Sequence, residues 1–353
     1  MRLLGVDLAR GLALLAVFVA HTAPIGPSSP MPERLLMGAD DIAAPLFILL
    51  FGVSAGLAAR AAEGEGRSRG QFRLFFAVRA GTLIAFGLLA DFIQPAVIPI
   101  LHYLGTVALL LLPALYLGAR WLLLLSASMV VMSATAMPYA QAAQMSLRRQ
   151  ALQGDGSGWV GNSAAALVGF VFSDYGYRVS ALLAFALAGL AVGRIAVAGW
   201  GRISCLFLAG GALLAIGLGM STLTGISAAA YAGTAPELIK STGLAAVVLA
   251  VSCALAATPI RHALVPVTAL GALSLTFYLG HILVLAAWWH LTGQPDDSWK
   301  MLLFLGVGSL LAAWLIRLRW RRGPAEWLVH RVARSLTGSG REGHYLQSGI
   351  GAE

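Results

Sequence analysis

Ten apolar windows, each long enough to cross a bilayer, dominate this sequence. A helix of about 20 apolar residues spans the hydrocarbon core, because each residue adds about 1.5 Å along the axis. The windows cover residues 4–24, 41–59, 74–94, 100–118, 121–139, 178–198, 203–224, 237–257, 265–291 and 299–317. We therefore predict an all-α polytopic membrane protein with about ten transmembrane helices, embedded in a lipid bilayer.

The composition excludes a soluble protein. Only 11% of the 353 residues are charged and 59% are hydrophobic, with a mean hydropathy of +0.81. A soluble domain carries about 25% charged residues, so this chain cannot cover a surface that faces water. The two cysteines, Cys205 and Cys253, both lie in apolar windows. They predict neither a disulfide framework nor a metal site, and we expect no metal cofactor.

The basic residues predict how the chain is oriented. The net charge is +9, and we attribute it to arginines that keep loops cytoplasmic, not to nucleic-acid binding. Basic loops at 60–73, 120, 194–202, 261–262 and 317–334 follow alternate windows. The loops at 25–40, 95–99, 226–236 and 292–298 are poorer in lysine and arginine. We therefore predict a multi-pass protein of the cell membrane with both termini in the cytoplasm.

Residues 140–177 fit this topology less well, because they carry Arg148 and Arg149 on the predicted outer side. Within them, residues 159–173 are apolar but short for a spanning helix. Spanning, re-entrant and interfacial arrangements all remain open, and a spanning helix would invert every later window. We expect one membrane domain over residues 1–334. The Gly/Ser-rich tail, 335–353, is predicted to be disordered and cytoplasmic.

Three ionisable residues share one face of the first window. Arg10 precedes His21 by 11 residues, which is about three turns and about 16 Å along the axis. Asp7 lies one turn before Arg10 on the same face. Charged groups inside a membrane are costly and usually functional, so this face should point into the protein. Two structural alternatives remain open: Asp7 and Arg10 as a simple ion pair, and His21 as a residue at the outer helix end.

Other polar residues lie near the same two levels of the membrane. Asp41 opens the second window, where it could simply cap the helix. Asp91 and His102 flank the loop between the third and fourth windows, at the predicted level of His21. His281 lies inside the ninth window. The sequence contains no HExxH, CxxC, Walker or GxSxG motif, which argues against zinc hydrolases, P-loop enzymes and common serine hydrolases.

Four segments resemble, in order, those of the transmembrane acyltransferases. These are "DLARGLALLAVFVAH" with its arginine-to-histidine spacing, "APLFILLFGVSAGLA", "GALSLTFYLGHIL" and "RRGPAEWLVHRV". The superfamily includes the acyltransferase-3 proteins and the heparan-α-glucosaminide N-acetyltransferases. The last two segments resemble the YeiB-like branch in particular. The resemblance implies transfer of an acyl group, usually acetyl from cytosolic acetyl-CoA, to an extracytoplasmic acceptor such as a sugar or glycan.

The resemblance also implies roles for individual residues. The histidine and arginine of the family's first-helix motif correspond to His21, as the catalytic group, and to Arg10. Asp91, His102 or Asp41 could orient the His21 imidazole. Because arginines bind phosphates well, we expect the CoA phosphates at the cytoplasmic mouth. The residues expected to hold the cofactor are Asp7, Arg10, Arg73, Arg79, His281, Arg319 and Arg322.

Two other classes of function remain open from the sequence. Intramembrane Asp, Arg and His also suit a proton-coupled transporter of small solutes, although the sequence shows no two-fold repeat. In a receptor or scaffold, the polar face would merely hold helices together. The identity of the acceptor, the length of the acyl chain and the presence of a homodimer are left open.

Overall fold

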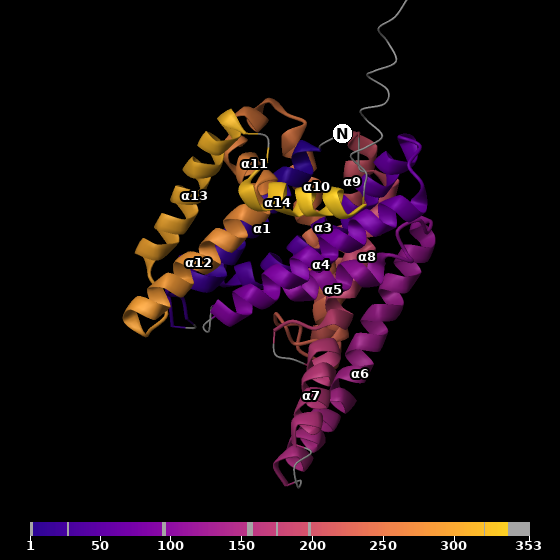
Figure 1. Ribbon diagram of the computed structural model, residues 1–353, viewed down its shortest axis with the longest axis vertical. Helices are drawn as coiled ribbons and strands as arrows, with labels where there is room; N and C mark the ends of the chain where they lie inside the picture. The colour runs from indigo at the N-terminus through magenta and orange to yellow at the C-terminus, as the bar shows by residue number, and fades with distance from the viewer. Residues whose placement is uncertain are drawn as a thin grey trace, which may run out of the picture.

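The computed structural model describes residues 3–26, 28–93, 97–153, 158–173, 176–196, 199–320 and 322–337. All regular elements in these ranges are helical (Figure 1). The main helices are α1 (Leu4–Thr22), α3 (Ala39–Gly64), α4 (Arg69–Ile93), α5 (Leu101–Leu111), α6 (Ala119–Gln153), α7 (Gly158–Val168), α8 (Val179–Ile195), α9 (Trp200–Thr224), α10 (Ala235–Ala256), α11 (Val265–Ala272), α12 (Ser274–Thr292), α13 (Trp299–Arg319) and α14 (Pro324–Thr337). Four short elements lie between them: α2 (Met31–Arg34), η1 (Leu35–Gly38), η2 (Gly169–Ser173) and η3 (Pro259–His262).

The predicted all-α polytopic membrane protein is confirmed. Among the described residues, eight helices are long and apolar enough to cross a membrane: α1, α3, α4, α6, α9, α10, α12 and α13. Two further windows coincide with the shorter apolar helices α5 and α8. The window 265–291 differs from expectation, because Leu273 divides it into α11 and α12.

The arginine-rich loops meet at one end of the bundle, which we call the inner end. Arg194, at the end of α8, forms an ion pair of 2.8 Å with Glu63, at the end of α3. Arg60 donates a hydrogen bond to the Arg194 carbonyl. Arg67, from the loop after α3, and Arg322, from the segment before α14, line one cavity. This convergence agrees with the predicted alternation of basic loops, and the cytoplasmic location of the inner end stays a prediction.

Residues 158–173 run back along the outer extension of α6 and end beside Gln144, far from the inner end of that helix. The 35 residues of α6 measure about 52 Å, far more than the roughly 30 Å of a hydrocarbon core. Its last turns project away from the other helices together with α7 (Figure 1). Gly161 of α7 lies against Ala151 of α6, and Ser173 donates a hydrogen bond of 3.1 Å to Gln144. The order of the later windows is therefore kept.

Helices α3 and α8 pack backbone against backbone through glycines. A Cβ atom at Gly189 would collide with the Leu49 carbonyl, and one at Gly52 would collide with the Ala186 carbonyl. Small residues allow this close approach in membranes, where van der Waals packing drives helix association. At the outer end of α3, Asp41 forms a 2.6 Å ion pair with Lys240 of α10. Asp41 thus has a structural partner in Lys240, whereas the hydrogen-bond partner of His21 in the described residues is His281.

The final helix, α14, covers the inner ends of α4 and α12 (Figure 1). Its Glu326 carboxylate accepts hydrogen bonds from the backbone amides of Leu275, at 2.8 Å, and Thr276, at 3.1 Å. These amides belong to the first turn of α12, where the chain itself supplies no acceptors. The helix continues to Thr337, three residues into the predicted tail. The rest of that tail, 338–353, lies outside the described residues.

Candidate active site

A cavity of about 490 Å³ opens at the inner end of the bundle. Four arginines and two glutamates line it, so its net charge is positive: Arg10, Arg67, Arg79, Arg322, Glu65 and Glu326. Arg67 and Glu65 form an exposed ion pair of 3.1 Å. On α3 its lining runs from Ala62 near the inner end to Phe47 near the outer end, which is about 22 Å along the helix. The deeper wall is apolar and includes Phe51, Phe76, Leu83, Leu101 and Leu104. The inner cavity is thus a cationic mouth followed by an apolar shaft.

Asp7 and Ser54 hold Arg10 in this wall. The Arg10 guanidinium donates to the Asp7 carboxylate at 2.9 Å, and it also donates to the Ser54 hydroxyl. Asp7 is 5% exposed, so its charge is compensated by Arg10 within the protein. Asp7 itself does not line the cavity. We therefore assign to it the positioning of Arg10, in place of direct contact with a cofactor.

A second cavity of about 440 Å³ opens at the opposite, outer end. His21 lines it, which places the imidazole of α1 on a cavity wall. The other lining residues come from α1, from α12 and from the outer connections: Ala20, Val97, Ile98, Gly176, Tyr177, Tyr231, Leu285, Trp289, Pro295, Asp296 and Asp297. The first-helix residues Arg10 and His21 therefore face two different cavities at opposite ends of the molecule.

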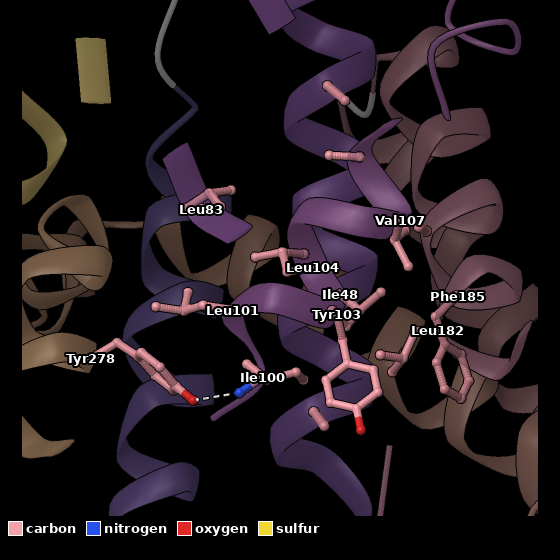
Figure 2. Packing of buried hydrophobic residues seen from close by; sticks show 14 of the residues in the cluster. Ile48, Leu83, Ile100, Leu101, Tyr103, Leu104, Val107, Leu182, Phe185 and Tyr278 are labelled. Atoms are coloured by element: carbon pink, nitrogen blue, oxygen red, sulfur yellow. Dashed lines mark hydrogen bonds between the residues drawn. The ribbon is translucent and has the colours of Figure 1, made fainter. Parts of the chain in front are cut away.

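Side chains of α12 lie between the two cavities. The Nδ1 atom of His21 lies 3.2 Å from the Nε2 atom of His281, which is 1% exposed. One turn earlier on α12, the Tyr278 hydroxyl accepts a hydrogen bond of 3.0 Å from the Ile100 amide (Figure 2). The Phe47 ring, which lines the inner cavity, lies 6.1 Å from the Tyr278 ring between centroids. Tyr278 and His281 thus form the barrier between the cavities.

Two predicted partners of His21 lie elsewhere. Asp91 is exposed at the end of α4. His102 stacks against Phe170, with ring centroids 5.9 Å apart, and also contacts Tyr103. Neither is among the described residues that line the two cavities. For Asp91 and His102 the sequence predicts only a depth in the membrane. Depth does not specify the direction in which a helix points its side chains.

Among the predicted cofactor residues, Arg10, Arg79 and Arg322 line the inner cavity, whereas Arg73 and Arg319 do not. Arg73 donates to the Pro113 carbonyl and lies 5.4 Å above the Tyr116 ring. His281 lies in the barrier, against His21, and does not line the cationic mouth.

His330 of α14 lines the inner cavity but was missed in the sequence. It follows Glu326 by one turn in "RRGPAEWLVHRV", and both face the cavity, so helical spacing offered a signal. Burial first, and then the nearby charges of Arg322, Arg334, Arg79 and Arg67, lower the pKa of His330 to about 4. The imidazole is therefore neutral at pH 7, and the positive charge of the mouth comes from arginine.

Comparison with known protein families identifies the family of this chain. A protein family described as "Heparan-alpha-glucosaminide N-acetyltransferase, catalytic" matches residues 2–223, well over half of the chain. The chain belongs to this family. The protein is thus a membrane enzyme of the N-acetyltransferase type, as the sequence resemblance implied at the level of the superfamily. No curated protein matches it closely enough to count as a relative.

The part of the chain that matches the N-acetyltransferase family contains only some of the site. It includes Arg10 and His21 of α1 and Arg79 of α4. His281 and the cavity residues of α14 lie beyond the matched range. Their assignment therefore rests on the geometry of this structure alone.

Proposed function

We propose that the protein transfers an acetyl group from cytosolic acetyl-CoA, bound in the inner cavity, to an extracytoplasmic acceptor in the outer cavity. The observation that carries this proposal is the pair of cavities that approach one barrier from opposite ends, with His21 on the outer side. Within the transmembrane acyltransferase superfamily, the resemblance of the last two segments to the YeiB-like branch supports the proposal that the chain belongs to that branch. Its location in the cell membrane and its cytoplasmic termini stay predictions, and the presence of a homodimer stays open.

The inner cavity suits the two ends of acetyl-CoA. Arg67, Arg79 and Arg322 can donate paired hydrogen bonds to phosphate oxygens at the mouth. The phosphates would stay there, because charged groups entering an apolar shaft pay a large desolvation cost. The slim pantetheine arm suits the apolar shaft, which ends at Phe47 next to the barrier; mouth and shaft together extend about 22 Å along α3. Transfer then requires Phe47 and Tyr278 to move apart.

The outer cavity suits an acceptor that carries hydroxyl or amine groups. The Asp296 and Asp297 carboxylates accept hydrogen bonds from such groups, and the rings of Tyr177, Tyr231 and Trp289 offer flat faces for packing. A sugar or glycan combines both properties. The lining thus supports an acceptor of this class without selecting one sugar.

His21 acts as the general base in this proposal. It takes a proton from the acceptor nitrogen or oxygen as that atom bonds to the acetyl carbon and the thioester C–S bond breaks. The proton then passes from His21 to the departing thiolate, so the products are the acetylated acceptor and CoA thiol. Acyl transfer through His21 itself would use the same atoms in two steps.

The transporter alternative keeps one observation in its favour. Two cavities on opposite sides of a barrier are also what alternating access requires. The two functions differ in what leaves the outer cavity: an acetylated acceptor in one case, and an unmodified solute in the other.

Purified protein in vesicles tests the proposal. With acetyl-labelled acetyl-CoA on the inner-end side and a glucosamine-containing oligosaccharide on the other, we expect label on the acceptor and free CoA only on the donor side. The Tyr278→Phe protein in the same vesicles shows whether opening of the barrier affects the rate of acetyl transfer. Solute flux without labelled acceptor, or no binding of acetyl-CoA, contradicts the enzyme and favours the transporter.

His330 predicts a pH dependence for binding at the mouth. Burial first, and then the field of the nearby arginines, hold the pKa of His330 near 4 in the free protein. Bound phosphates would offset the field of the arginines, so the pKa of His330 should rise on binding. A pKa that rises on binding makes affinity increase as pH falls through the raised value, up to about tenfold per unit of the rise. The relevant window lies between pH 4 and the raised pKa. Calorimetry at several pH values measures it.

His330→Gln is the matched control for this titration. The CoA phosphates titrate near pH 6 themselves, but equally in both proteins. The ratio of the dissociation constants, variant over wild type, should therefore grow as the pH is lowered from 7.5 to 5.5. A ratio that does not change with pH contradicts the placement of the phosphates near His330.

A further inference from the structure

The proposed reaction does not use the contact between His21 and His281, which lies in the barrier. The two imidazoles come from α1 and α12, 260 residues apart, and their rings are nearly parallel, with an interplanar angle of 23°. Phe18 packs on His281 at 5.4 Å between ring centroids, and Tyr278 packs on it at 5.0 Å. The surroundings of His281 are thus aromatic, and its two nitrogens have two different polar neighbours.

The hydrogen-bond partners determine which nitrogens carry protons. The Nδ1 atom of His281 is bonded to the Tyr278 carbonyl oxygen. A carbonyl oxygen can only accept, so this Nδ1 must carry hydrogen and donate. In a neutral imidazole the other nitrogen, Nε2, is then bare and accepts. The Nδ1 atom of His21, 3.2 Å away, must therefore donate to it.

This chain of donors has a consequence at the outer cavity. If Nδ1 of His21 carries hydrogen, then Nε2 of the neutral ring is bare. Nε2 lies on the ring edge away from His281, and His21 lines the outer cavity. A bare nitrogen on that edge is what a general base or a nucleophile needs.

We propose that His281 is a positioning residue that fixes the tautomer of His21 and leaves Nε2 of His21 bare towards the outer cavity. This role rests on the proposed function, in which His21 is the base. When Nε2 accepts the proton of the acceptor, the positive ring keeps its Nδ1–H bond to Nε2 of His281. His281 keeps its own proton on Nδ1, against Tyr278, so the pair carries one positive charge at most.

Replacing His281 by glutamine or by asparagine distinguishes the role of its Nε2 atom from that of its Nδ1 atom. The glutamine Oε1 can reach the position of Nε2 and still accept from His21, whereas the asparagine amide reaches only the position of Nδ1. We expect His281→Gln to keep kcat within about tenfold of wild type. His281→Asn and His281→Leu should lower kcat about 10²-fold, as the loss of a general base does.

The KM for acetyl-CoA should not change in any of these variants, because His281 does not line the inner cavity. If His281 had only a structural role, the activity lost in each of the three variants would follow the decrease in that variant's melting temperature. Activity that follows stability, or equal activity in His281→Gln and His281→Asn, overturns the proposal.

Nitrogen-15 spectra of the wild-type chain in detergent test the same point without any activity. The chain has seven histidines, so the signals of His21 and His281 are assigned by comparison with His21→Ala and His281→Gln. We expect both rings to carry hydrogen on Nδ1 and to be bare at Nε2. Hydrogen on Nε2 of His21 overturns the proposal. A wild-type chain that shows no acetyl transfer would refute the proposed function and leave this measurement intact.

Discussion

Replacing His21 by alanine is expected to lower acetyl transfer by about 10³-fold and to leave acetyl-CoA binding unchanged. General bases contribute about 10²–10⁴-fold to the rate, and His21 is the only histidine among the described residues that line the outer cavity. Binding should persist, because the arginines of the inner cavity lie on the other side of the barrier. Single-turnover rates give the chemical step, and calorimetry in detergent gives the affinity.

His290→Ala is the matched control for His21→Ala. Like His21, His290 lies at the outer end of the molecule, but it belongs to α12. Its Nε2 atom contacts the Ile93 carbonyl, and it does not line the outer cavity. We expect near wild-type rates in that variant and in His102→Ala. A His21→Ala protein with near wild-type turnover would refute the catalytic assignment, and a loss of acetyl-CoA binding in this variant would refute the separation of the two cavities.

Removing two inner-cavity arginines is expected to weaken acetyl-CoA binding about 10²-fold. Arg79→Ala combined with Arg322→Ala deletes two phosphate donors, and one charge-assisted hydrogen bond is worth about 1.5 kcal/mol or more. A loss of about 3 kcal/mol corresponds to roughly 10² in the dissociation constant. The turnover at saturating acetyl-CoA should change little, because neither arginine lies near His21. The dissociation constant and its dependence on salt are the measurements.

The pair Arg73→Ala and Arg319→Ala removes the same charge from the same end of the protein. Both were predicted from sequence to hold the cofactor, yet neither lines the inner cavity. If acetyl-CoA binding depends mainly on general attraction to a basic surface, the two double variants will bind acetyl-CoA equally weakly. Their dissociation constants will then also depend equally on salt concentration. We expect the Arg73/Arg319 protein to bind within about threefold of wild type, since exposed charges contribute little at physiological salt.

The arrangement of Arg10 and His21 could be predicted because it depends on one helix only. Eleven residues of an α-helix place the two side chains on one face and at two depths, whatever surrounds them. The structure keeps that separation, with Arg10 on the inner cavity and His21 on the outer cavity. The windows could be predicted for a similar reason, because each depends on the local density of apolar residues.

The partners of these residues could not be predicted, because they depend on how distant helices rotate and pack. His281 meets His21 across 260 residues, whereas His102, which the sequence placed at the same depth, turns towards Phe170. Asp41 was ambiguous until Lys240 of α10 was found beside it. Depth gives the position of a residue along the membrane normal only. Side-chain contacts also depend on how the helices are placed and rotated within the membrane plane.

By itself, the sequence determined an all-helical membrane protein, the alternation of its basic loops and the polar face of its first helix. These properties follow from hydrophobicity and helical periodicity, which act over about 20 residues. Only the tertiary structure decided that the polar face serves two cavities with a barrier between them. Glycines such as Gly189 let helices touch at their backbones, and Glu326 fixes the start of α12, so the position of His281 depends on contacts between segments far apart in the chain.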